Sequence, residues 1–240
     1  GRAEGSVIKI LDRGYKTIVG TITPTSGGAI VVPDDQRFAD SIFVPVNKLG
    51  GASGVSKVVL KIDEYPSRTR MSQGEVVEVL GDPKSFKVTT LSMIRSFGLI
   101  EDFPQDVVKE ADERNVPVSE EMIKGRKDFR NELTITIDGE DARDFDDAIS
   151  LSMKGDIYVL KVHIADVSNY VTENSALDKE AFRRGTSVYF PDYVLPMLPK
   201  TLSNGICSLN PEEDRLTMSV TMQFDKTGNI LDYNICEGVI

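Results

Sequence analysis

The feature that most constrains this chain is a short acidic segment between residues 134 and 148, with isoleucine-rich sequence on both sides. Between Asp138 and Asp147 the segment holds six acidic residues and one basic residue. Like charges this close repel one another, and a buried unpaired carboxylate is costly, so such a cluster persists only where solvent or a cation stabilises it. The segment therefore predicts either an oxygen-ligand site for Mg²⁺ or Mn²⁺, or a solvated acidic turn.

Other loop motifs fit the acidic segment poorly. An EF-hand calcium loop needs an acid at its twelfth position, and counting from Asp138, Asp141 or Asp144 places none there. A phosphate-binding loop and a serine nucleophile elbow are absent from the sequence. What remains is a carboxylate-only site, which suits metal-assisted hydrolysis of a phosphodiester.

Composition excludes several classes of protein. The 240 residues allow one large domain or two ordinary ones, and a hydrophobic fraction of 40% is enough for a core. The net charge of −10 argues against non-specific binding to nucleic acid, although an acidic metal site supplies part of that charge. Cys207 and Cys236 form no disulfide framework or zinc spacing. The sequence has no signal peptide and no apolar run of about 20 residues, so we expect a cytoplasmic protein with no membrane partner. We also expect no small-molecule cofactor.

Residues 1–95 predict a small all-β domain. Short β-branched runs, beginning with 7–11 and 17–22, are separated by Gly, Pro and Asp and show little helical periodicity. The number of strands fits an OB-like barrel, a fold that commonly binds single-stranded nucleic acid. Candidate contacts are the basic and aromatic residues Arg13, Tyr15, Lys16, Arg37, Phe38, Lys48, Arg68 and Arg70. For each of these residues taken singly, a structural role is the stronger interpretation: Phe38 is as readily a core residue, and Tyr15 can simply close a hairpin.

Residues 96–133 predict a helical connector. One helix spans 104–114, and a second begins at Ser119 as N-cap and extends to Arg130. Its bases form either a basic stripe or, as we favour, a solvated helix face: Lys124, Arg126, Lys127 and Arg130.

Residues 134–240 predict a mixed α/β domain. Strands at 148–153 and 157–165 form a hairpin, and the second is expected to be central. It ends at Asp166, a second candidate ligand, and it contains His163, which we interpret as a core residue. A helix at 174–185 precedes a proline-rich loop at 186–199 that is not expected to form strands but can present an aromatic ring to a base. An alternating strand at 216–224 and a last strand from Ile230 follow.

Residues 136–148 closely resemble the signature of the ribonuclease II/ribonuclease R (RNB) family of exoribonucleases. Further segments match that family in the same order: 163–167, 189–191, 196–199, 202–203 and 207–211. Upstream, Glu4-Gly5, Val19-Gly20, 33–35 and 78–81 resemble the second cold-shock domain of a ribonuclease R-type enzyme. The resemblance covers nearly the whole chain and implies an α+β protein with a cold-shock barrel followed by part of an RNB-type catalytic domain.

The resemblance implies a function and a set of site residues. The family hydrolyses single-stranded RNA processively, 3′→5′, to nucleoside 5′-monophosphates with Mg²⁺. Asp138, Asp144, Asp146 and Asp147 match its four catalytic aspartates and would hold metal, with Asp146 the most directly catalytic; Glu140 and Asp141 would lie outside the site. Tyr189 matches the tyrosine that stacks on a base near the RNA 3′ end.

The family's catalytic domain is longer than residues 134–240, and its second half carries a catalytic glutamate and arginine. We therefore expect this chain to be weakly active or inactive by itself, because lost charge-stabilising groups cost orders of magnitude in rate. The alternatives are a non-catalytic RNA-binding module of the same fold and, less favoured, an acidic-loop adhesion module.

Overall fold

The computed structural model describes residues 4–38, 40–67 and 69–240, so the candidate contact Arg68 lies outside the described residues. The chain forms two compact units, residues 1–100 and residues 101–240. The first contains the predicted barrel, and the second contains both the predicted connector and the predicted catalytic region. The predicted boundaries at residues 95 and 133 stay a prediction.

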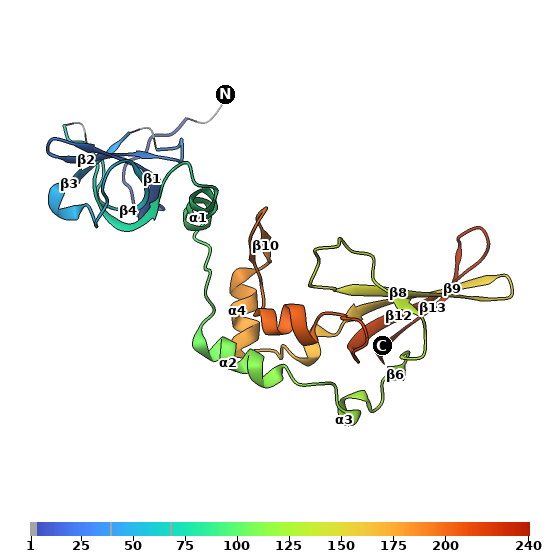
Figure 1. Cartoon of the computed structure of the whole chain (residues 1–240). Helices are drawn as coiled ribbons and strands as arrows, with labels where there is room; N and C mark the ends of the chain where they lie inside the picture. Colours follow the sequence, from blue (N-terminus) through green and yellow to red (C-terminus); the bar gives the residue numbers. More distant parts are fainter. Residues whose placement is uncertain (1–3, 39, 68) are drawn as a thin grey trace. The chain divides into compact units, whose positions relative to one another are not determined.

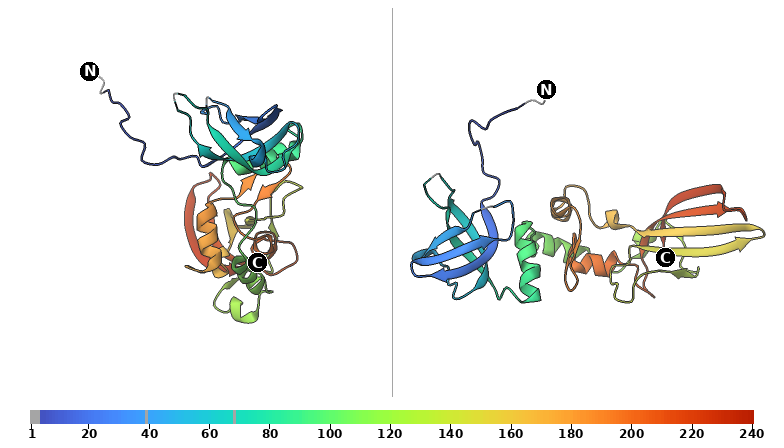
Figure 2. Two further views of the ribbon diagram at one scale, coloured as in Figure 1. Left: turned by 90° about the vertical axis from the view of Figure 1, so that its left-hand side faces the viewer. Right: turned by 90° about the horizontal axis from the view of Figure 1, so that it is seen from above.

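The first unit contains a closed five-stranded barrel, seen at the blue end of the chain in Figures 1 and 2, with strand order β1-β2-β3-β5-β4. Its strands are β1 (Thr17–Thr25), β2 (Gly28–Pro33), β3 (Ile42–Pro45), β4 (Ser56–Glu64) and β5 (Gln73–Gly81), with a short 3₁₀ turn, η1 (Val46–Lys48), after β3. Branched side chains such as Val31, Ile42 and Leu60 fill its interior and are fully buried. The predicted OB-like barrel is confirmed.

Two parts of this unit differ from the prediction. Residues 7–11 alternate in hydrophobicity but form no strand, and Val7 and Ile8 are almost fully exposed because no neighbouring strand pairs with them among the described residues. Conversely, the helix α1 (Phe86–Ser96) was not predicted. Val88 and Ile94 are buried on one side of it, so tertiary packing supports a helix that its weak apolar pattern did not reveal.

The second unit is built on a six-stranded sheet of order β6-β13-β12-β9-β8-β7 (Figure 1). The strands are β6 (Lys127–Asp128), β7 (Thr134–Ile135), β8 (Asp147–Lys154), β9 (Ile157–Ala165), β12 (Leu216–Phe224) and β13 (Ile230–Val239). β8 and β9 form the predicted hairpin, with Gly155 at a φ of 62° in its turn. The expectation that β9 is central is confirmed, since β8 and β12 flank it.

Short helices accompany this sheet: α2 (Gln105–Arg114), α3 (Glu120–Ile123), η2 (Val167–Asn169), α4 (Ala176–Arg184) and η3 (Leu202–Ile206). The second connector helix is much shorter than predicted. Ser119 does cap it by accepting a hydrogen bond from the Met122 amide, but Gly125 has a φ of 90° and the chain then enters β6. α2 and α4 contribute Val107, Ala111 and Leu177 to one apolar cluster with Leu202.

The proline-rich segment 186–199 forms a small hairpin, which corrects the prediction of a strand-free loop. β10 (Val188–Tyr189) pairs with β11 (Val194–Leu195), and the Phe190 amide donates to the Tyr193 carbonyl at 2.7 Å. The prolines do not prevent this pairing because they follow each strand instead of interrupting it. Within the described part of the chain, every helix is too short or too polar to cross a membrane.

Candidate functional site

The acidic loop connects β7 to β8, and its last aspartate, Asp147, is the first residue of β8. The Asp146 carbonyl accepts a hydrogen bond from the Ala165 amide at 2.9 Å, so the loop runs beside the end of β9. All four predicted site aspartates thus lie on this one connection. The sheet register fixes where the loop enters β8, because Asp147 pairs with Ile164.

A residue distant in sequence fixes the shape of the loop. The Ser208 hydroxyl donates to the Arg143 carbonyl and accepts from the Phe145 amide, each at 3.0 Å. The Leu209 amide donates to the Phe145 carbonyl at 2.9 Å. Ser208 is fully buried, so these bonds do not compete with water. No role was predicted for Ser208, because only folding brings this residue to the loop.

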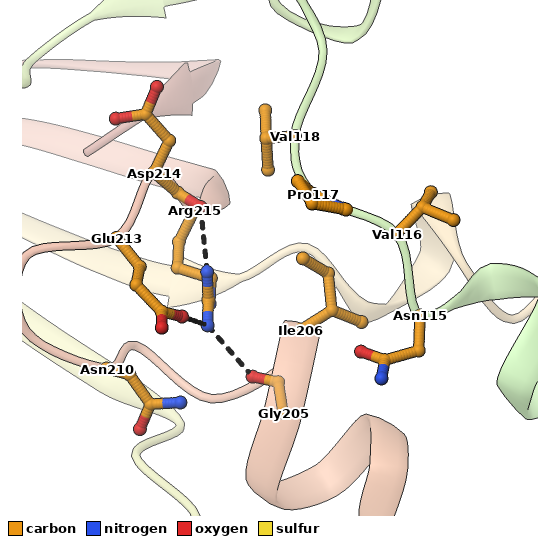
Figure 3. A pocket seen from close by; sticks show the side chains of 10 residues that line it. All are labelled: Asn115, Val116, Pro117, Val118, Gly205, Ile206, Asn210, Glu213, Asp214 and Arg215. Carbon is orange, nitrogen blue, oxygen red and sulfur yellow. Dashed lines mark hydrogen bonds and ion pairs between the residues drawn. The ribbon is translucent and has the colours of Figure 1, made fainter.

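Arg215 in turn holds the segment that carries Ser208. Its Nε donates to the Ser208 carbonyl at 2.7 Å and its Nη2 to the Gly205 carbonyl at 3.3 Å. Figure 3 shows this guanidinium at the wall of a pocket, beside Glu213, with which it forms an ion pair. Carbonyl groups and a carboxylate accept the hydrogen bonds of the Arg215 guanidinium. Arg215 therefore supports the segment that holds the acidic loop, and it adds little free positive charge to the pocket.

The four aspartates influence one another electrostatically. Loss of hydration raises the pKa of Asp146, although its side chain keeps contact with solvent, and repulsion from Asp144, Asp147 and Asp138 raises it further. Carboxylate oxygens are the ligands that Mg²⁺ and Mn²⁺ prefer, so the donor set fits such an ion. In the described ranges, however, no three carboxylate, imidazole or thiolate groups are arranged to hold one ion.

Tyr189 joins the acidic loop from the β10–β11 hairpin. Its hydroxyl donates to Asp144 Oδ2 at 2.6 Å, a short bond of the charge-assisted kind. This bond, together with partial desolvation, raises the pKa of Tyr189 to about 12. The residue as a whole is 63% exposed. The structure therefore brings the predicted base-stacking residue to one of the predicted metal ligands, 45 residues away in sequence.

Two other candidates have structural partners. Asp166 forms a buried ion pair with Arg126 at 2.7 Å and accepts a hydrogen bond from the Ser168 hydroxyl. Arg126 is thus part of the interior and not of a basic stripe or a solvated face. His163 is fully buried between Ser150 and Ser219, with its ring nitrogens 3.1 and 2.8 Å from their hydroxyls. The interpretation of His163 as a core residue is confirmed.

In the barrel, several predicted RNA contacts form one aromatic and basic cluster. The Arg13 guanidinium lies 4.3 Å from the centre of the Tyr65 ring, and Arg37 lies 5.2 Å from that of Tyr15. Phe38 packs edge-on against Tyr15, with ring centres 5.3 Å apart. Two aromatic rings with guanidinium groups over them are suited to stacking against bases.

Two basic residues of the barrel, including one member of this cluster, are partly neutralised. Arg37 forms hydrogen bonds to both carboxylate oxygens of Asp35. Lys48 forms an ion pair with Asp63 at 2.7 Å. Such pairs lower the positive charge that these two residues can offer to phosphates.

Comparison with known proteins defines the class. The RNB domain family matches residues 126–240 and the cold shock domain family matches residues 30–104. The chain therefore carries an RNB-type region that is preceded in sequence by a cold-shock barrel, as the sequence motifs predicted.

The relatives narrow this class to ribonuclease R-like proteins. The chain is 46% identical over 243 residues to ribonuclease R of Thermotoga maritima, covering all of this chain and 34% of that protein. It is 42% identical to ribonuclease R of Acidithiobacillus ferrooxidans, over all of this chain and 55% of that protein. Mycoplasma genitalium RNase R, solved with ribose-methylated single-stranded RNA, superimposes with a TM-score of 0.89 at 28% identity, over 98% of this chain and 37% of that one. The chain thus spans about a third to a half of these relatives.

Proposed function

We propose that this chain is the part of a 3′→5′ exoribonuclease that carries the acidic loop, and that the whole protein hydrolyses single-stranded RNA to nucleoside 5′-monophosphates with Mg²⁺, which Mn²⁺ can replace. One observation carries this proposal: four aspartates gather on a single loop inside the segment that matches the RNB domain. The similarity to ribonuclease R over the full chain supports it. A cytoplasmic location stays a prediction.

The aspartates are assigned distinct roles. Asp138, Asp144 and Asp147 would hold the metal, and Asp146 would orient the attacking water or help to hold a second ion. A bound divalent ion neutralises phosphate charge and lowers the pKa of a water ligand. Ser208 keeps the loop backbone in place, and Tyr189 offers an exposed ring on which the terminal base can stack.

RNA is the proposed partner of both units. A relative with the same fold was solved with single-stranded RNA, which supports this assignment. In this chain, the candidate contacts are Tyr189 in the second unit and the aromatic and basic cluster around Tyr15 and Tyr65 in the first. Stacking on an aromatic ring contributes about 1–3 kcal/mol for each base and tolerates any sequence.

A non-catalytic RNA-binding module is the second candidate. Its support is the aromatic and basic cluster around Tyr15 and Tyr65, which offers rings for base stacking independently of the acidic loop. The two candidates differ in one property: only the nuclease releases mononucleotides, and only with a divalent ion.

A single-turnover assay separates the candidates. The 240-residue chain, in excess over 3′-labelled single-stranded RNA, is incubated with Mg²⁺ or with EDTA, and released 5′-monophosphate is measured. We expect slow, Mg²⁺-dependent release that Asp146→Asn lowers by at least about a hundredfold, with RNA affinity nearly unchanged. Asp141→Asn is the matched control, since it removes an acid from the same loop that is not assigned to the site. RNA binding without any release would favour the binding module only when the whole protein is assayed, since the 240-residue chain is expected to be weakly active or inactive by itself. Equal loss of binding and release in Asp146→Asn would contradict its assigned role.

A further inference from the structure

The backbone on both sides of Asp144 is held in place by one buried side chain. The residues on either side of it, Arg143 and Phe145, are both bonded to the buried hydroxyl of Ser208 at 3.0 Å. With its neighbours fixed in this way, the remaining freedom of Asp144 lies in the rotation of its side chain.

The hydroxyl of Tyr189 removes that remaining freedom. It donates to Asp144 Oδ2 at 2.6 Å, and no other side chain donates to this carboxylate among residues 4–38, 40–67 and 69–240. The second oxygen, Oδ1, is therefore left available for a cation. A carboxylate held in one rotamer loses less conformational entropy when it binds an ion than a freely rotating one.

The hairpin that carries Tyr189 is itself restrained. The Phe190 amide bonds the Tyr193 carbonyl at 2.7 Å, and the Met197 amide bonds the Ser187 hydroxyl at 2.9 Å. Tyr189 is nevertheless largely exposed. A single side chain thus offers its face to solvent and its hydroxyl to the acidic loop.

We propose that Tyr189 is a positioning residue for Asp144, in addition to any base stacking by its ring. The hydroxyl orients the carboxylate for the divalent ion, so metal affinity depends on an atom of the residue that contacts the RNA base. This inference rests on the proposed function, because it assigns Asp144 to a metal. A hydrogen-bond partner of a metal ligand typically changes metal affinity by about 10–100-fold.

The test separates the hydroxyl from the ring. Mn²⁺ affinity of the 240-residue chain is measured by electron paramagnetic resonance, and affinity for fluorescent single-stranded RNA is measured in EDTA. We expect Tyr189→Phe to bind Mn²⁺ about tenfold more weakly while it keeps its RNA affinity. Tyr189→Leu should lose affinity for both. Because the side chain is largely exposed, both variants should keep the fold, which circular dichroism checks.

Tyr193→Phe is the matched control. It removes a hydroxyl from the same hairpin that has no hydrogen-bond partner among the described residues, so its Mn²⁺ affinity should equal that of the unsubstituted chain. Unchanged or tighter Mn²⁺ binding in Tyr189→Phe would overturn the inference, as would equal weakening in Tyr193→Phe. If the unsubstituted chain binds no Mn²⁺ at all, the metal assignment of the proposed function fails, and the positioning role fails with it.

Discussion

Ser208 shows how one buried hydroxyl can decide the shape of a site. Replacing it by alanine leaves the Phe145 amide and the Arg143 carbonyl without their partner. We expect Ser208→Ala to lower the free energy of unfolding of the second unit by about 1–3 kcal/mol and to speed hydrogen exchange at the Phe145 amide. Ser203→Ala is the control, since among the described residues that hydroxyl bonds only the neighbouring Asn204 side chain. An unchanged exchange rate at Phe145 would contradict the role of Ser208.

His163 makes stability depend on pH. Burial lowers its pKa below the ordinary 6.5, with a smaller opposing effect of Glu132. The unfolded chain therefore binds a proton as pH falls through 6.5, while the folded chain does so only at lower pH. The free energy of unfolding should be highest above about pH 7.5 and should fall as the pH decreases to about 5.5. Urea unfolding at several pH values measures the slope. Since the sequence has one histidine, His163→Gln should flatten this dependence of stability on pH. An unchanged slope would show that other groups cause the dependence.

Tyr170 is a buried residue whose hydroxyl has no hydrogen-bond partner among the described residues. Its desolvation raises its pKa to about 12. Because an unsatisfied buried hydroxyl contributes no favourable bond, Tyr170→Phe should leave the free energy of unfolding unchanged or raise it by up to about 1 kcal/mol. Thermal unfolding checks this. Clear destabilisation would mean that the hydroxyl has a partner such as ordered water.

At the scale of the element, the six-stranded sheet buries its polar face. Thr217 and Ser219 of β12 are fully buried beside His163, while Met218 on the other face is 41% exposed. The same outer face includes Leu151 and Ile235 at 63% and 61% exposure. Apolar alternation in β12 was visible in the sequence, but which face would be buried was not.

This apolar face predicts self-association of the 240-residue chain. Exposed apolar patches larger than a few hundred Å² favour association. We expect sedimentation velocity to show concentration-dependent oligomers, which Leu151→Lys combined with Ile235→Lys should reduce. Phe182→Lys is the control, because this residue is 89% exposed on α4, outside the sheet. A chain that stays monomeric at all concentrations would contradict the prediction.

At the scale of the whole molecule, each compact unit has its own core. We therefore expect two unfolding transitions that respond to different substitutions. A Cβ at Gly20 would lie 2.5 Å from the Val32 carbonyl oxygen in the barrel, and one at Gly238 would lie 2.9 Å from the Phe129 ring in the second unit. Each glycine-to-alanine change should cost about 1–3 kcal/mol in its own unit only. Calorimetry measures both transitions, and a shift of both by either change would show one cooperative molecule.

The sequence by itself determined what depends on near neighbours along the chain. Short β-branched runs placed the barrel strands, the Lys154-Gly155-Asp156 turn placed the hairpin, and local spacing brought the aspartates into one loop. Tertiary structure alone decided the contacts of residues far apart in sequence: Ser208 beside the loop, Tyr189 on Asp144, and Arg126 buried against Asp166. The physical reason is that periodicity encodes the conformation and the two faces of an element, whereas burial and pairing depend on which other element arrives to pack against it.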